Sequence, residues 1–365
     1  MDILTHVSSV RGAQARGLEI GSTFAAQIRD AADRYHAFFT LRGLPEATVR
    51  EIAQNSLAAL QDWCPRLATE LVATAAGAGV ETWRLAALNA RTEVLAAIGP
   101  DSEGECSTMV YAPEGSEPET MQTWDWHADL CPTGLVIEFV PGDDDASTHH
   151  LVTRVRLFTE LGVLGKIGVN DAGLGVHFNI LHHASDRPTG GVPVHAVARR
   201  ILEEARSLEE AETIARSARV SASTVITVAV NSASGQRAAS LELSPAGVAT
   251  VLPDHDGWLL HTNHYLDPVL VGGEATRDPS TTYARYDHLR SRVPMLAHLP
   301  VRERAAQFAG PEGALAPVCF TPNPADPPHE QWTTLLTISL ELAAGRLSYA
   351  AGNPAYLAEH GAELF

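Results

Sequence analysis

A change in the spacing of apolar residues near position 100 constrains the fold of this 365-residue chain more than any other feature. Between residues 23 and 98, apolar side chains recur every three to four positions, which predicts helices that each bury one face. We expect three or four helices there, including residues 46–60, 66–76 and 81–98. Pro45 and Pro65 precede the first two, which is typical of the first turn of a helix.

After residue 100 the pattern changes to the two-residue alternation of strands, and helical spacing returns at residues 194–205 and 208–218. The expected strands are residues 108–112, 120–126, 134–140, 150–158, 224–230, 238–243, 247–252, 257–261, 332–341 and 345–350. We interpret the Pro-rich residues 317–328 as an ordered surface loop. This order predicts an α+β protein, with a four-layer α/β/β/α sandwich of two antiparallel sheets as one option among several α+β folds.

Composition excludes several classes of function. A net charge of −18 argues against nucleic acid as a partner, because phosphate binding needs a clustered basic surface. No segment approaches the roughly 20 apolar residues of a membrane span, and residues 1–4 do not resemble the start of a signal peptide, so we expect a cytoplasmic protein. The four cysteines are far apart, which fits neither a disulfide framework nor a thiolate zinc site. They are Cys64, Cys106, Cys131 and Cys319.

Cys106 differs from the other cysteines in its context. It follows the polar, turn-like residues 101–105 at the point where helical spacing gives way to strands. A thiol in this position can attack the carbonyl of the preceding residue, Glu105, and water then releases an amino-terminal cysteine. The new α-amine titrates near pH 8 and can take the thiol proton, so no histidine partner is needed. We therefore predict that Cys106 is a nucleophile exposed by self-cleavage.

Seven short segments follow in a fixed order. They are residues 104–108 (GECST), 123–126 (TWDW), 165–170 (GKIGVN) with Gly173, 179–182 (NILH), 187–190 (RPTG), 241–245 (LELSP) and 261–264 (HTNH). Together they resemble the acyl-coenzyme A:6-aminopenicillanate (isopenicillin-N) acyltransferase family of self-cleaving N-terminal-nucleophile (Ntn) cysteine hydrolases. Lys166, the only lysine among 26 basic residues, falls inside one segment, which indicates a local requirement.

The resemblance implies the Ntn-hydrolase fold, the α/β/β/α sandwich. It also implies that cleavage between Glu105 and Cys106 divides one domain into a mainly helical α chain, residues 1–105, and a β-rich β chain, residues 106–365. The expected activity is hydrolysis or transfer of the acyl group of a small N-acyl amine through an acyl-enzyme on Cys106. We expect no cofactor, with an acyl thioester such as acyl-CoA as a candidate co-substrate.

The same resemblance suggests roles for other residues. Asn263 is expected to donate a hydrogen bond to the tetrahedral oxyanion, unless it only satisfies a turn. Asp125 is expected beside Cys106, orienting its amine or offering a backbone N–H to the oxyanion, unless it is an exposed strand acid. Ser244 is expected to bond the amine or assist cleavage, unless it is a turn residue. We expect substrate contacts from Trp124, Trp126, Asn179 and His182, with structural support around the pocket from Asn170, Asn179 and Lys166.

Two departures from the resemblance bear on the substrate. Glu105 precedes the cysteine where the fungal acyltransferases have glycine, and Phe320 follows Cys319 where they have arginine. The second departure predicts a missing positive charge and argues against penicillin itself as the substrate. Two other functions stay open: a binding protein that never cleaves, and a metallohydrolase. The histidines considered for the metal are His177, His182, His183, His261 and His264.

Overall fold

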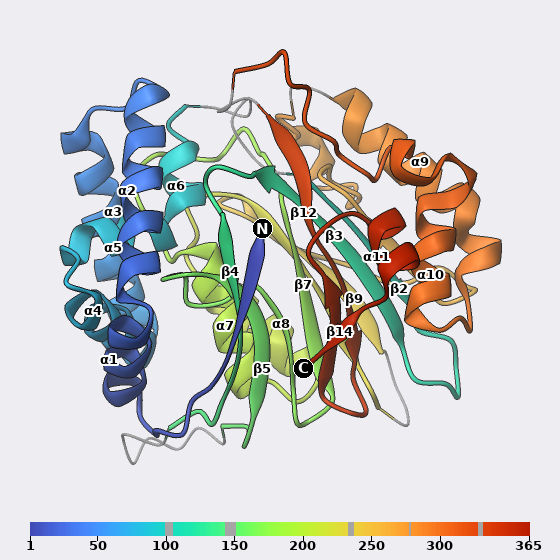
Figure 1. Cartoon of the computed structure of the whole chain (residues 1–365), viewed down its shortest axis with the longest axis horizontal. Coiled ribbons are helices and arrows are strands. Elements are labelled where there is room, and N and C mark those ends of the chain that lie inside the picture. Colours follow the sequence, from blue (N-terminus) through green and yellow to red (C-terminus); the bar gives the residue numbers. More distant parts are fainter. Residues whose placement is uncertain (99–104, 143–150, 233–236, 277–278, 328–330) are drawn as a thin grey trace.

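The computed structural model describes residues 1–98, 105–142, 151–232, 237–276, 279–327 and 331–365. Two β-sheets lie face to face, and helices cover the outer side of each sheet (Figure 1). This arrangement confirms the predicted α+β class with two mostly antiparallel sheets. None of the helices in the described ranges is long and apolar enough to cross a membrane.

The first sheet has eight strands in the order β1-β4-β5-β6-β7-β8-β9-β10. Their bounds are β1 Asp2–Val7, β4 Thr133–Phe139, β5 Val155–Glu160, β6 Ile167–Asn170, β7 Leu174–Ile180, β8 Thr224–Val230, β9 Ala238–Ser244 and β10 Gly247–Val251. All neighbours are antiparallel except β1 and β4, which run parallel. Periodicity did not predict β1, and the strand expected at residues 150–158 begins at Val155, residue 150 lying outside the described ranges.

The second sheet has six strands in the order β11-β2-β3-β12-β13-β14. Their bounds are β2 Glu105–Tyr111, β3 Glu119–His127, β11 Trp258–His261, β12 Trp332–Glu341, β13 Arg346–Ala350 and β14 Glu363–Leu364. Because side chains alternate along β2, Cys106 and Thr108 face the first sheet while Ser107 and Met109 face the helices behind. Residues 106–110 are buried on both faces, so the start of β2 lies deep in the molecule.

Six helices precede β2 in the described part of the amino-terminal segment. They are α1 Ala13–Thr23, α2 Ala25–Leu41, α3 Glu46–Trp63, α4 Pro65–Ala78, α5 Thr82–Asn89 and α6 Arg91–Leu95. The single helix expected at residues 81–98 is wrong, because the chain breaks between α5 and α6. The Asn89 amide leaves the helix direction to donate to the carbonyl of Gly162 at 2.8 Å and to accept from the backbone N–H of Leu164 at 2.9 Å.

The other helices complete the outer layers. Helices α7 Val194–Glu204 and α8 Leu208–Ser217 pack on the first sheet, close to their predicted bounds. Helices α9 Pro279–Leu296, α10 Val301–Ala309 and α11 Pro354–His360 cover the second sheet, and none of these three was predicted (Figure 1). Residues 317–327, in the predicted Pro-rich loop, form no helix or strand, and residues 328–330 lie outside the described ranges.

A buried ion network joins the amino-terminal helices to α7. Glu70 of α4 accepts hydrogen bonds from Arg16 of α1 at 2.5 Å and from Arg199 of α7 at 2.9 Å. The two guanidinium groups lie over the Phe139 ring, 4.7 and 4.0 Å from its centre. Since removing one partner of a buried pair leaves an uncompensated charge, this network ties residues on both sides of Cys106 into one structure.

Candidate active site

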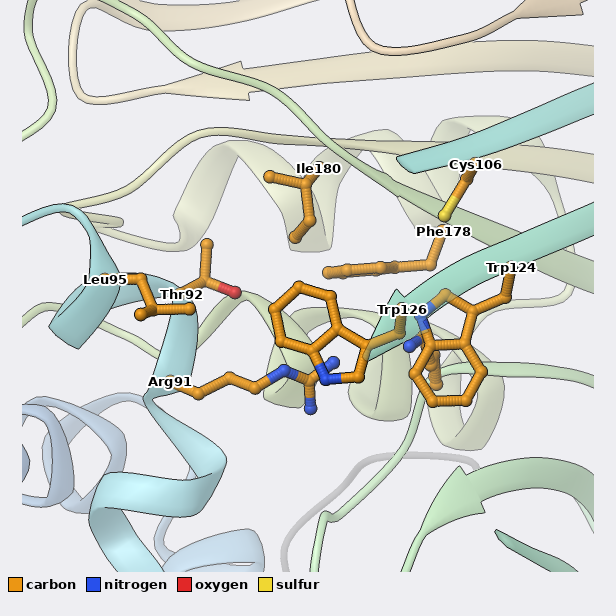
Figure 2. A pocket seen from close by; sticks show the side chains of 9 residues that line it. Arg91, Thr92, Leu95, Cys106, Trp124, Trp126, Phe178 and Ile180 are labelled. Atoms are coloured by element: carbon orange, nitrogen blue, oxygen red, sulfur yellow. The ribbon is translucent and has the colours of Figure 1, made fainter. Parts of the chain in front are cut away.

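Cys106 is the second residue of β2 and is only 2% exposed. Its side chain lines a cavity between β2, β3, β7 and α6 (Figure 2). The cavity encloses about 300 Å³ of space, part of it open to solvent. Its lining residues are Arg91, Thr92, Leu95, Cys106, Trp124, Trp126, Lys166, Phe178 and Ile180. The predicted nucleophile therefore reaches a cavity built from residues on both sides of the predicted cleavage point.

The backbone of Cys106 is held by three separate elements. Its N–H donates to Oδ1 of Asn263, which follows β11, at 3.0 Å. Its carbonyl oxygen accepts hydrogen bonds from Nη1 of Arg285 in α9 at 2.6 Å and from Nδ2 of Asn179 in β7 at 3.3 Å. The peptide groups around the candidate nucleophile are therefore fixed in position and satisfied in a buried environment.

The orientation of the Asn263 amide follows from its neighbours. Its oxygen faces two donors, the N–H of Cys106 and Nη2 of Arg285, the latter at 2.9 Å. Its nitrogen donates to the carbonyl of Ile180 at 2.8 Å. A flipped amide would point donors at donors, so the hydrogen-bond network fixes this orientation. An amide nitrogen carries two N–H donors, and the bond to Ile180 uses one of them.

Arg285 is the main residue of the site that sequence reasoning missed. Besides its bonds to Cys106 and Asn263, it donates to Oγ of Ser107 at 3.1 Å and forms an ion pair with Glu105 at 3.0 Å. Its guanidinium carbon lies 5.9 Å from the centre of the Phe320 ring. The absence of an arginine at position 320 therefore does not leave the site without a positive charge, because α9 supplies one.

Asp125 lies on β3 directly opposite Glu105 in the β2–β3 pairing and is fully buried. Its Oδ1 accepts a hydrogen bond from Thr334 at 2.5 Å, and its backbone N–H donates to the Cys106 sulfur. Burial raises the pKa of Asp125 to about 7, with Glu105 adding to the effect and Arg285 opposing it. The alternative of an exposed strand acid is wrong, since Asp125 adjoins both residues of the predicted cleavage point.

The cavity wall is held by a hydrogen-bonded chain that starts at Trp126. The indole N–H of Trp126 donates to the Tyr35 hydroxyl at 2.8 Å, and that hydroxyl donates to Oε2 of Glu160 at 2.7 Å. The other oxygen of Glu160 pairs with Arg91 at 2.7 Å and with Lys166 at 3.3 Å. Buried charges in this chain therefore fix an aromatic wall of the cavity.

Burial raises the pKa of the Cys106 thiol to about 12, and the positive charge of Lys166 is the largest opposing effect. In the uncleaved chain the thiol is therefore neutral at physiological pH. A base that takes its proton is needed before the sulfur can act as a nucleophile.

The family model that matches this chain is described as acyl-coenzyme A:6-aminopenicillanic acid acyl-transferase, and it matches residues 144–356, more than half of the chain. The chain belongs to this family. The match includes Lys166, Asn263 and Arg285 and begins after Cys106, so the nucleophile assignment depends on the site geometry and the sequence.

This acyltransferase-family chain is also similar to individual proteins. It is 30% identical over 250 residues to the 40 kDa form of acyl-coenzyme A:6-aminopenicillanic-acid-acyltransferase of Emericella nidulans, covering 67% of this chain and 64% of the relative, slightly less than two thirds of its length. Penicillin V acylase from Agrobacterium tumefaciens matches with 14% identity, a TM-score of 0.42, and coverage of 67% and 83%. The Caenorhabditis elegans ortholog of N-acylethanolamine-hydrolyzing acid amidase matches with 14% identity, a TM-score of 0.39, and coverage of 65% and 93%.

The predicted substrate-binding residues of this family member fall into two groups. Trp124 and Trp126 line the cavity beside Cys106. Asn179 lies between the sheets, where its amide bonds Thr108 and three backbone carbonyls, which fits structural support better than substrate contact. His182 follows β7 and is not among the residues that line the cavity. Asn170 supports the end of α7 by donating to the carbonyls of Leu202 and Ala205.

The structure does not bring Ser244 to Cys106. Ser244 ends β9, two strands beyond β7 in the first sheet. Its hydroxyl bonds the carbonyl of Gly247 and the N–H of Ala246 within the β9–β10 turn. The expected contact with the nucleophile's amine is therefore wrong for this chain conformation, and the plain turn explains the Ser-Pro pair.

The histidines considered for a metal site have other partners. His261 bonds Oε1 of Glu242 at 2.8 Å, and His264 bonds the hydroxyl of Thr282 at 2.9 Å. His177 bonds Gln122 at 3.0 Å, and His183 bonds Ser185 at 2.7 Å. In the ranges that the structure describes, no group of three histidine, cysteine or acidic side chains is suited to hold a metal ion.

Proposed function

We propose that this protein cleaves its own chain between Glu105 and Cys106 and then acts as a cysteine amidohydrolase or acyltransferase on small N-acyl amines. The observation that carries the proposal is the position of Cys106. Its side chain lines the cavity while its own nitrogen is held 3.0 Å from the Asn263 amide oxygen. One residue thus presents both a nucleophile and the nitrogen that becomes its base.

Self-cleavage starts when the Cys106 sulfur adds to the carbonyl carbon of Glu105. The C–N bond then breaks, the nitrogen of Cys106 takes up the thiol proton, and Glu105 is left as a thioester on the sulfur. Water adds to this thioester and releases the Glu105 carboxylate and the free thiol. Asp125, with a pKa raised to about 7, is suited to supply or hold a proton beside the scissile bond.

In turnover, the free α-amine takes the thiol proton as the sulfur adds to the substrate carbonyl. Oδ1 of Asn263 is suited to accept a hydrogen bond from this amine and to orient it. The second N–H of the Asn263 amide and the backbone N–H of Asp125 are our candidate donors for the oxyanion. Departure of the substrate amine with the proton leaves an acyl-enzyme on Cys106.

The acyl-enzyme can pass its acyl group to water, which completes hydrolysis, or to an acceptor amine, which completes transfer. An acyl thioester can load the same sulfur, because thiolate exchange also yields a thioester on Cys106. The amino-terminal segment is required after cleavage, since Arg91, Thr92 and Leu95 of this segment line the cavity. The buried Glu70–Arg199 pair supports its retention.

The test compares the wild-type protein with Cys106→Ala and with Cys64→Ala, a control at a buried cysteine between α3 and α4. We expect wild type and Cys64→Ala to be cleaved, to hydrolyse N-acyl amides and to be labelled at residue 106 by an electrophilic acyl probe. Cys106→Ala should stay intact and inactive. Activity in Cys106→Ala would refute the proposal, and a folded wild-type protein that is neither cleaved nor labelled would favour a binding protein.

A further inference from the structure

Lys166 stands out because a buried ammonium group is costly and this chain uses it once. It is the only lysine among 26 basic residues, it is 2% exposed, and it lines the cavity that contains Cys106. Arginine replaces lysine at every other basic position, including buried ion pairs such as Arg199–Glu203. A single lysine here indicates a need for a compact ammonium, which binds as a point charge rather than a planar fork.

The ammonium of Lys166 has three N–H donors and two partners in the structure. Its nitrogen lies 3.2 Å above the centre of the Trp124 ring and 3.3 Å from Oε1 of Glu160. One donor therefore has no protein partner. A buried polar group with unused hydrogen-bonding capacity beside a nucleophile is expected to meet a ligand.

The negative charge near Lys166 is already shared. Oε1 of Glu160, its carboxylate partner, lies closer to Arg91, at 2.7 Å, and Oε2 accepts the Tyr35 hydroxyl. None of the residues that line the cavity is acidic. The potential inside the cavity is therefore positive, and an anionic group that enters it replaces lost hydration with the Lys166 ammonium.

The rest of the cavity suits a short carbon chain. Trp126, Phe178 and Ile180 form apolar walls, and Leu95 closes the side that α6 provides (Figure 2). A ligand that extends from the Cys106 sulfur into this space passes apolar walls and meets one cation. That combination selects an acyl group with an apolar middle and a charged end.

We infer that Lys166 binds a carboxylate at the far end of the acyl group, so that the preferred substrates are half-amides of short dicarboxylic acids. This inference rests on the proposed function and adds the class of acyl group. Burial lowers the pKa of Lys166 to about 8, and Glu160 opposes this effect, so the ammonium is charged at neutral pH. The residue acts on specificity, not on the reacting bond.

The test uses one chromogenic amine with two matched acyl series. Succinyl, glutaryl and adipyl amides carry the carboxylate, and butanoyl, pentanoyl and hexanoyl amides have the same carbon counts without it. We expect the wild-type protein to prefer at least one anionic amide over its neutral match by about tenfold or more in kcat/KM, which a charged hydrogen bond can supply. Equal or higher kcat/KM for all three neutral amides would overturn the inference.

Lys166→Met separates specificity from structure. It should lower kcat/KM for the preferred anionic amide by about tenfold or more, mainly through KM, and change the neutral match by less than about threefold. An equal loss for both amides would assign Lys166 a structural role. If Lys166→Met does not fold, the wild-type comparison still decides. A protein that is cleaved and labelled at Cys106 but prefers neutral acyl groups refutes this inference alone, whereas an unlabelled, uncleaved protein refutes the proposed function.

Discussion

Replacing Arg285 with methionine should slow self-cleavage sharply, because this residue holds the peptide that contains the nucleophile. The substitution keeps an unbranched chain of similar length and removes the bonds to the Cys106 carbonyl, at 2.6 Å, and to Oδ1 of Asn263, at 2.9 Å. It also removes the ion partner of Glu105. Arg290→Met, at an exposed position of the same helix, is the matched control.

The size of the effect follows from these contacts. A hydrogen bond to a charged group contributes roughly 1.5–3 kcal/mol, and breaking a buried pair costs about 3–5 kcal/mol. Glu105 is 21% exposed, so water compensates part of the loss on its side. We expect the uncleaved chain to lose about 3 kcal/mol of stability, and a similar loss in the transition state would slow cleavage about 100-fold.

The two effects need separate assays. Stability is measured by urea unfolding with Cys106→Ala in both proteins, so that neither is cleaved. Cleavage is followed by gel or mass spectrometry after refolding of the chain with Cys106 intact. Arg285→Met that cleaves as fast as Arg290→Met, with an equal unfolding midpoint, would refute the role of Arg285.

Three further outcomes are expected. Asp125 has its pKa raised from 3.8 to about 7, so its neutral form stabilises the fold fully below about pH 4 and this contribution is lost as the pH rises through 7; Asp125→Asn in uncleavable protein should therefore lose less melting temperature than its parent between pH 5 and 8. Ser244→Ala should leave the cleavage rate within about threefold of wild type, because the hydroxyl bonds only the β9–β10 turn; a larger fall would restore its catalytic role. Since the lowered pKa of Lys166 is about 8, the preference for anionic acyl groups should be present below that pH and vanish as Lys166 loses its proton above it; a preference unchanged at pH 10 would contradict this.

Much of the fold could be predicted because most strands carry a clear local pattern. The predicted strand at residues 332–341 has the observed bounds of β12, and the predicted helix at residues 194–205 ends one residue beyond α7. Cys106 was predicted correctly at the change from helices to strands. The approach of Asp125 to Cys106 could also be expected, since a short connection joins two adjacent antiparallel strands.

Other features depend on contacts that leave no local pattern. Helix α9 has a polar, irregular sequence with Pro294 inside it, so neither the helix nor the role of Arg285 was predicted. The bond between Arg285 and Cys106 joins residues 179 positions apart. β1 pairs in parallel with the distant β4, and its short amino-terminal sequence gave no sign of a partner. Tertiary packing decided these elements, as it often does where local propensity is weak.

The most direct test of the central claim is the mass of the purified protein under denaturing conditions, combined with amino-terminal sequencing of each chain. The account predicts two chains, one that ends at Glu105 and one that begins with Cys106, and a single intact chain for Cys106→Ala. Wild-type protein that hydrolyses N-acyl amides while remaining one uncleaved chain would contradict it.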